Sequence, residues 1–125
     1  MIKQKEYAAR RKELMSMMHS NSIAIISSAP EKVRSRDTHY PYKQNVNLTY
    51  LCGFPEPEAV LVLMPGRQLG EMIVFCREKD PLRETWDGYR EGPQGAIANF
   101  GADDAFPISD IDDILPNLIE GKDRL

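Results

Sequence analysis

The sequence predicts an α/β fold, with a mixed β-sheet flanked by helices. Three observations support this prediction: a helical pattern leads into a β-branched run near the start, two apolar runs of strand length lie in the middle, and helical segments marked by proline and glycine follow residue 80. A chain of 125 residues is long enough for one hydrophobic core, so we expect a single domain over residues 1–125.

The first three elements are predicted from local periodicity. From Lys3 to His19, apolar side chains recur at helical spacing and charged ones occupy the other side, which predicts an amphipathic helix. Ser22 to Ser28 carries β-branched residues on alternate faces, which predicts an interior strand covered on both sides. Val46 to Leu51 alternates in polarity and predicts a half-buried strand.

Two fully apolar runs are predicted to pair as a hairpin. They are Ala59–Met64 and Met72–Cys76, and the residues between them, 65–70, contain the proline and glycines of a turn. The sheet is therefore expected to be mixed or antiparallel.

The second half is predicted to be mainly helical. Pro93 stands where a first helical residue is favoured and Gly101 where a left-handed C-terminal residue is favoured, so Pro93–Phe100 is predicted as a helix. A last helix is predicted to begin at Ser109, with Pro116 kinking it.

Composition excludes several classes of protein. The net charge of −3 and pI of about 5.4 argue against a nucleic-acid binder, which needs a concentrated basic face. No apolar run approaches the roughly 20 residues of a membrane helix. The start of the chain lacks the apolar core of a signal peptide, so a cytoplasmic location is predicted.

The residues suggest no catalytic centre. Cys52 and Cys76 lie in apolar runs outside any CxxC pair and are predicted to be buried reduced thiols. No HExxH, nucleophile elbow or glycine-rich phosphate loop is present, so no catalytic, metal-binding or cofactor-binding residue is assigned to this chain.

Two places nevertheless are candidates for function. Asp37, which follows Arg34-Ser35-Arg36, would be held ionised by the two arginines, and it either serves a site or ties its loop to the domain. Trp86 lies in a polar, glycine-flanked segment, so it either contacts a partner or substrate or packs over the sheet edge.

An extended motif then resembles the amino-terminal domain of aminopeptidase P, in the creatinase and prolidase superfamily. The matching residues are Arg34 and Asp37, Tyr40-Pro41-Tyr42-Lys43-Gln44-Asn45, Tyr50-Leu51-x-Gly53-Phe54, Glu56-Pro57-Glu58 and Trp86-x-Gly88. The resemblance implies a ribonuclease H-like α/β domain without catalytic residues of its own. It also implies that the chain is incomplete at its C-terminus, lacks a following pita-bread catalytic domain and is inactive alone.

In the parent protein, the resemblance implies a Xaa-Pro aminopeptidase, a metallopeptidase that removes the N-terminal residue before proline with two manganese ions held by the absent domain. The implied partners of this chain are its own C-terminal catalytic domain, further copies in a homo-oligomer, and peptides with proline in second position. Trp86, Asp37, Tyr40 and Tyr42 would border the substrate entrance or a subunit interface.

Two other functions fit the same residues. The first is a free-standing module that binds peptide or protein without catalysis. The second is a creatine- or dipeptide-cleaving relative with the same fold, although Glu56-Pro57-Glu58 and the Tyr-Pro-Tyr segment favour aminopeptidase P.

Overall fold

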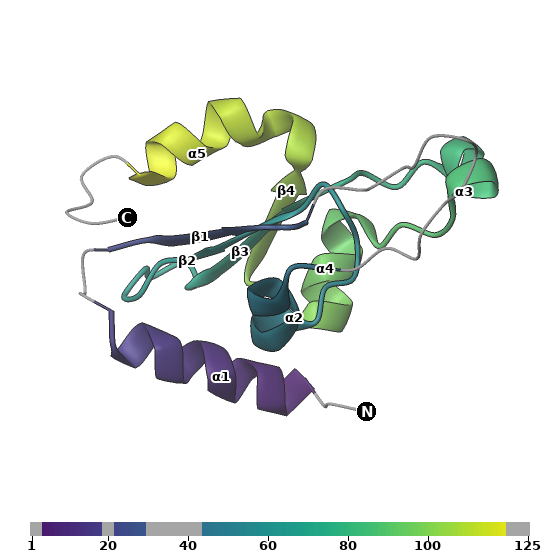
Figure 1. Ribbon diagram of the computed structural model, residues 1–125. Helices are drawn as coiled ribbons and strands as arrows, with labels where there is room; N and C mark the ends of the chain where they lie inside the picture. The colour runs from purple at the N-terminus through teal and green to yellow at the C-terminus, as the bar shows by residue number, and fades with distance from the viewer. Residues whose placement is uncertain (1–3, 19–21, 30–43, 120–125) are drawn as a thin grey trace.

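The computed structural model describes residues 4–18, 22–29 and 44–119, and these residues form a mixed sheet with helices on its two faces (Figure 1). The four strands of this part of the chain lie in the order β1 (Ala24–Ser27), β2 (Val60–Leu63), β3 (Met72–Cys76) and β4 (Asp104–Pro107). β1 and β3 each pair antiparallel with β2, whereas β4 runs parallel to β3. The predicted fold class is confirmed.

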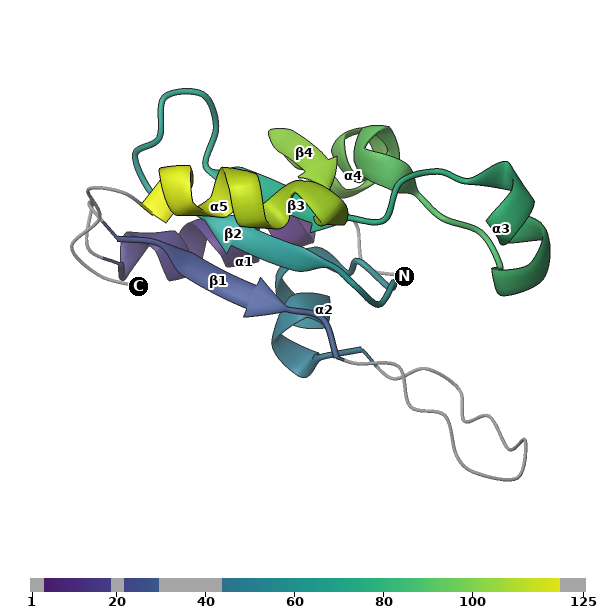
Figure 2. The same ribbon diagram turned by 90° about the horizontal axis from the view of Figure 1, so that it is seen from above.

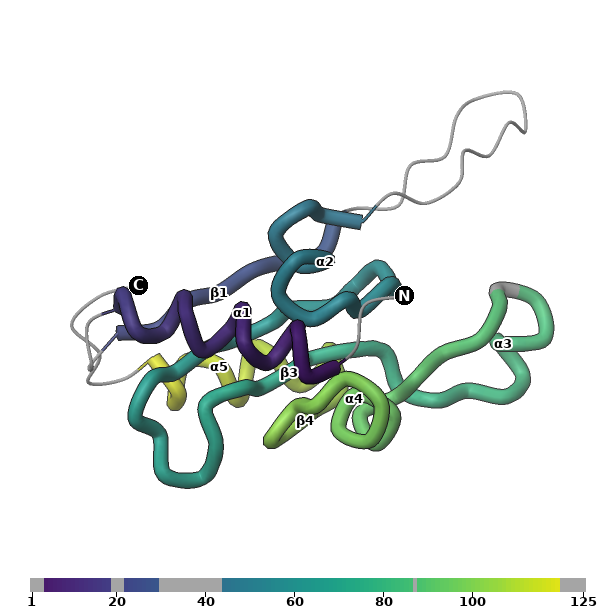
Figure 3. Tube along the Cα trace, turned by 90° about the horizontal axis from the view of Figure 1, so that it is seen from below, coloured from purple at the N-terminus to yellow at the C-terminus, as the bar shows by residue number. Residues whose placement is uncertain are grey.

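The helices form two layers and one outlying element. α1 (Gln4–Ser16), α2 (Val46–Cys52) and α4 (Gly92–Phe100) cover one face, which Figure 3 views directly, and α5 (Ile111–Ile119) covers the other, entered through a short 3-10 helix, η1 (Ile108–Asp110). α3 (Pro81–Asp87) lies beyond the end of the sheet in both Figure 1 and Figure 2. The helices therefore make three layers with the sheet, and α3 stands outside them.

The alternation of side chains along the strands divides the core into two clusters. On the face of α1, α2 and α4 lie Leu61, Leu63, Met72, Val74 and Cys76, each nearly or completely buried. On the face of α5 lie Val62, Ile73 and Phe75, against which the apolar residues of α5 pack. Since β2 and β3 are buried on both faces, their sequences are apolar throughout.

The hairpin and the helix before Gly101 are as predicted. β2 and β3 fall inside the two apolar runs, and α4 ends at Gly101, which adopts φ 78° and donates its backbone N–H to Ala96 O. α5 begins two residues after Ser109 and contains Pro116. Both cysteines are free and buried, as predicted.

The predicted strand at Val46–Leu51 is wrong, because these residues form α2. The side chain of Asn45 accepts hydrogen bonds from Asn47 N at 2.9 Å and Leu48 N at 3.2 Å, which caps the helix N-terminus. Gly53 ends the helix in the left-handed conformation at φ 71°. Six alternating residues fit a strand or two helical turns equally, and the two caps decide for the helix.

Among the described strands, the predicted interior strand at Ser22–Ser28 is instead an edge strand. β1 does have apolar contacts on both faces, since Ala24 and Ile26 meet one cluster and Ile25 the other. Within the described part of the sheet, however, it pairs on one side only, with β2. A β-branched composition indicates that both faces of a strand are covered by side chains. It does not indicate whether one or two strands pair with it.

The predicted N-terminal helix is present, but its buried face includes a charge. Leu14 and Met15 pack against the core, whereas the residue of α1 that is buried outright is Arg11, at 6% exposure. Its Nη1 donates to Leu51 O at 2.9 Å, which ties α1 to the C-terminal end of α2. Burial lowers the pKa of the Arg11 guanidinium.

Candidate functional site

Trp86 lies on α3, in a connection that leaves the sheet after β3 and returns at α4. We call residues 79–91 the α3 arm. Trp86 is 85% exposed there, so within the described residues it does not pack over the sheet edge. This exposure favours the interpretation in which Trp86 contacts a partner or substrate.

Two further large apolar side chains are exposed on the same arm. Leu82 is 77% exposed and Tyr89 is 64% exposed. Together with Trp86 they place three apolar side chains on one short protruding segment, and exposed aromatic residues commonly serve as anchors at interfaces. No periodic pattern in the sequence marks Leu82 or Tyr89 as a site residue.

Polar contacts close the α3 arm on itself. The Glu84 carboxylate accepts from Lys79 Nζ at 2.9 Å, from Arg90 N at 2.9 Å and from Asp80 N at 3.0 Å. Asp80 in turn caps α3 by accepting from Arg83 N at 3.2 Å. These contacts lower the pKa of Glu84, with the Arg90 N–H as the largest cause, and raise the pKa of Lys79, chiefly through its hydrogen bond to Glu84. Asp80-Pro81, a capping residue followed by proline at the first helical position, is the sequence signal that could have predicted this helix start.

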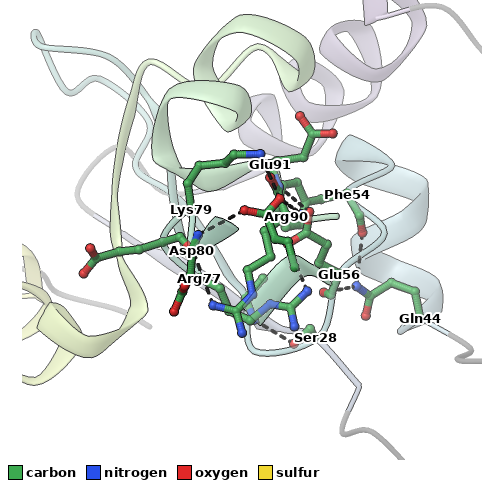
Figure 4. A network of polar contacts seen from close by, with 12 residues as sticks. Ser28, Gln44, Phe54, Glu56, Arg77, Lys79, Asp80, Arg90 and Glu91 are labelled. Carbon is green, nitrogen blue, oxygen red and sulfur yellow. Dashed lines mark hydrogen bonds and ion pairs between the residues drawn. The ribbon is translucent and has the colours of Figure 1, made fainter. Parts of the chain in front are cut away.

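A second carboxylate, Glu56, fastens the base of the arm, as Figure 4 shows. Its Oε1 lies 3.2 Å from Arg77 Nη2 at the end of β3, and its Oε2 accepts from Glu91 N at 2.7 Å. Glu56 is only 7% exposed. One buried carboxylate therefore joins the segment after α2 to the end of β3 and to the last residue of the arm.

The described part of the family-like motif builds the connection that carries Glu56. Gln44 Nε2 donates to Glu56 O at 2.8 Å and to Phe54 O at 3.1 Å, while its Oε1 accepts from Ala29 N at 3.0 Å. Phe54 is buried and packs edge-on against Phe100, with 5.0 Å between ring centroids. These residues have structural roles, and the motif places Glu56 at the arm's base.

Two buried guanidinium nitrogens lie in the same region. The Nε atoms of Arg77 and Arg90 have no hydrogen-bond partner in the part of the chain that the structure describes. Arg90 holds the arm by donating from Nη1 to Glu78 O at 3.3 Å. These two buried Nε–H groups are therefore unused donors beside the base of the arm.

The other predicted site residues, Asp37, Tyr40 and Tyr42, lie outside the described residues, within 30–43. Their assignment to a substrate entrance or interface stays a prediction.

No catalytic centre is assembled from the residues in the structure. Among residues 4–18, 22–29 and 44–119, no group of three or more His, Cys, Asp or Glu side chains could hold a metal ion. Burial raises the pKa of Cys52, and it is the largest cause that raises the pKa of Cys76 to about 12. Neither thiol is therefore an accessible thiolate near neutral pH. Over the same residues, no helix is both long and apolar enough to cross a membrane.

A separate cavity of about 450 Å³ opens between α1, α2 and the β1 edge. Arg10, one of the residues that line it, donates to Tyr50 O at 3.0 Å and places its guanidinium 4.3 Å from the Tyr50 ring centroid. None of the residues predicted to form a site lines this cavity, and the α3 arm does not reach its lining.

Comparison with known proteins matches residues 7–125 to a family described as "Aminopeptidase P, N-terminal domain". The chain is 39% identical to human Xaa-Pro aminopeptidase 3 over 94% of its own length and 25% of the relative's. It is 40% identical to Escherichia coli Xaa-Pro aminopeptidase over 98% of its length and 28% of the relative's.

Solved structures agree with this similarity. The aminopeptidase PepP of Pseudomonas aeruginosa superimposes with a TM-score of 0.95 and 61% identity, covering 98% of this chain and 28% of that one. The chain therefore spans about a quarter of the length of the relatives it matches.

Two other relatives bear on metal and location. One structure is described as zinc-substituted Escherichia coli aminopeptidase P in complex with product, so a metal accompanies that enzyme. A relative from Arabidopsis thaliana, 36% identical, is named as mitochondrial, so relatives of this chain are not confined to one compartment.

Proposed function

Because the chain belongs to the family of aminopeptidase P N-terminal domains, we propose that it is the non-catalytic first domain of a Xaa-Pro aminopeptidase. The parent enzyme would remove the N-terminal residue that precedes a proline. The observation that carries the proposal is the match along nearly the whole chain to relatives of which it spans only about a quarter. The remaining three quarters would then contain the catalytic domain.

The α3 arm is the part of this chain that we propose to serve the reaction. It presents Trp86, Leu82 and Tyr89 outside the sheet layers, where they can border a substrate entrance or contact another copy in a homo-oligomer. Exposed aromatic side chains on a fixed support are suited to both tasks, since they bury large areas with little loss of side-chain freedom.

Metal chemistry is proposed for the catalytic domain only. Two manganese ions would supply the Lewis acid and the activated water there. The described residues of this chain offer no group of three or more metal ligands, so we derive no step of the reaction from them. The isolated chain is accordingly proposed to be inactive, and the parent enzyme is proposed to be cytoplasmic.

The proposal is tested with the full-length protein. Purified enzyme should release the first residue from a Xaa-Pro peptide, lose this activity with a chelator and regain it with Mn²⁺, while residues 1–125 alone should release none. Trp86→Ala in the full-length enzyme should lower kcat/KM. Leu69→Ala is the matched control, because Leu69 is 78% exposed but lies between β2 and β3, outside the arm.

A binding module without catalysis is the second candidate, favoured by the same exposed apolar side chains. It predicts that residues 1–125 bind a proline-containing peptide on their own, in a manner that Trp86→Ala abolishes. Full-length protein that binds such peptides but never cleaves them with any divalent metal would favour the module over the aminopeptidase.

A further inference from the structure

We propose that Glu84 is a positioning residue, whose carboxylate keeps the α3 arm closed and thereby fixes the direction in which Trp86 is presented. The functional part of this inference rests on the proposed role of the arm at a substrate entrance or subunit contact. Its structural part concerns this chain alone.

The first step is that α3 has no hydrophobic support. None of its residues belongs to either core cluster, and all of its described side chains except Glu84 are exposed. A helix of seven residues is not stable by itself in water. The conformation of α3 must therefore depend on the polar contacts of the arm.

The second step is that Glu84 joins the two ends of the arm. Its Oε1 accepts from Arg90 N, after α3, at 2.9 Å, and its Oε2 accepts from Asp80 N, before α3, at 3.0 Å. The ion pair of Oε1 with Lys79 Nζ, also at 2.9 Å, adds a third donor. The Glu84 side chain is only 12% exposed, so these contacts are partly shielded from water.

The third step is that Lys79 completes the same closure. Its Nζ also donates to Arg90 O at 2.8 Å and lies 4.1 Å from the centroid of the Tyr89 ring. Gly92 leaves room for the Lys79 stem, since a Cβ there would lie 2.6 Å from Lys79 Cγ. The side chains of Lys79 and Glu84 together connect the start of the arm, α3 and the end of the arm.

The last step connects Glu84 to Trp86. Successive side chains on an α-helix are rotated by about 100° around the helix axis, so the side chains of residues two apart, such as Glu84 and Trp86, are rotated by about 200°. With Glu84 held against the arm's ends, the same helical turn directs Trp86 away from them, in keeping with its 85% exposure. Releasing Glu84 should therefore free the turn that carries Trp86.

The structural test uses Trp86 itself, since it is the single tryptophan of the chain. We would measure time-resolved fluorescence anisotropy of residues 1–125 for the parent sequence, Glu84→Gln and Glu78→Gln, after circular dichroism has established that each folds. Glu78 is an exposed glutamate beside the arm, and among the described residues its carboxylate makes no hydrogen bond or ion pair. Glu84→Gln should increase the fast local depolarisation of Trp86, and Glu78→Gln should not.

A second variant covers the case in which Glu84→Gln does not fold. Lys79→Met removes the ion pair and the bond to Arg90 O but leaves the backbone bonds of Glu84, so it should increase the fast depolarisation by a smaller amount. Unchanged depolarisation in the folded variants would overturn the inference.

The functional test is a double-mutant cycle in the full-length enzyme. Glu84→Gln should lower kcat/KM toward the value of Trp86→Ala, and it should cause no further loss when Trp86 is already alanine. Additive losses would show that Glu84 does not act through Trp86. If Trp86→Ala itself leaves kcat/KM unchanged, the proposed function of the arm fails instead, while the anisotropy result still stands.

Discussion

Glu56 and Arg77 form an ion pair across the base of the α3 arm, with 3.2 Å between Glu56 Oε1 and Arg77 Nη2. Their side chains are only 8% and 14% exposed. The same carboxylate accepts the Glu91 N–H, so one buried group contacts both the residue that follows β3 and the C-terminal end of the arm.

Glu56→Gln should therefore destabilise the domain strongly. The change leaves the Arg77 charge buried without its partner. It also places an amide N–H₂ group, itself a donor, against the donors Arg77 Nη2 or Glu91 N. Breaking a buried ion pair in this way typically lowers the free energy of unfolding by about 3 kcal/mol. Urea unfolding measures this quantity. Glu58→Gln, two residues away and exposed, is the control and should change it little; a loss in Glu56→Gln no larger than in this control would contradict the assigned role.

Asn45→Ala should destabilise α2 by removing its N-terminal cap. The free energy of unfolding should fall by about 1 kcal/mol, because the side chain satisfies two otherwise unpaired backbone N–H groups. Asn45→Asp keeps an accepting oxygen and should be close to neutral. Equal losses in the alanine and aspartate variants, measured by urea unfolding, would argue against capping.

Gly53→Ala should destabilise the chain for two separable reasons. The residue adopts φ 71°, and an added Cβ would lie 2.6 Å from Cζ of Tyr7 on α1. The left-handed conformation alone disfavours alanine by about 1 kcal/mol, and displacement of the Tyr7 ring adds to that loss. In a Tyr7→Ala background the added loss should disappear and the conformational part should remain; an unchanged effect of Gly53→Ala there would exclude the steric contribution.

Stability should fall at alkaline pH through Cys76. Burial raises its folded-state pKa to about 12 from the ordinary value of 9.0, so the folded state keeps a proton that the unfolded state releases. The stabilising effect of this bound proton is therefore complete below pH 9.0 and is lost progressively as pH rises from 9.0 toward about 12. Urea midpoints across this range, compared with Cys76→Ala, measure the difference; parallel pH profiles would contradict the raised pKa.

The predictions that held came from patterns that one segment contains by itself. β2 and β3 are apolar at every position because helices cover both faces of the sheet, and few other structures accept such runs of strand length. α4 was found from Pro93 and Gly101 because proline and glycine restrict the backbone locally. The family motif likewise predicted the domain to which the chain belongs.

The candidate site was predicted only in part. Trp86 was recognised from its polar, glycine-flanked surroundings, but the residues that hold its arm were not. Lys79, Glu84 and Arg90 are ordinary charged residues in sequence, and their contacts exist only once the arm folds back on itself. Glu56 belonged to the motif, yet its partners Arg77 and Glu91 lie 21 and 35 residues further along the chain.

The sequence by itself determined the α/β class, the central hairpin and the family. The patterns that indicate them, which are burial on both faces of a strand, helix capping and an extended motif, each lie within a contiguous stretch of residues. Tertiary structure decided that β1 lies at an edge of the sheet that the described residues form, that β4 pairs parallel to β3 and that Arg11 is buried beside Leu51. It also decided that Trp86 faces solvent. Each of these features depends on which segment, distant in sequence, packs or pairs with the residue or strand concerned. The local periodicity of a sequence does not specify such contacts.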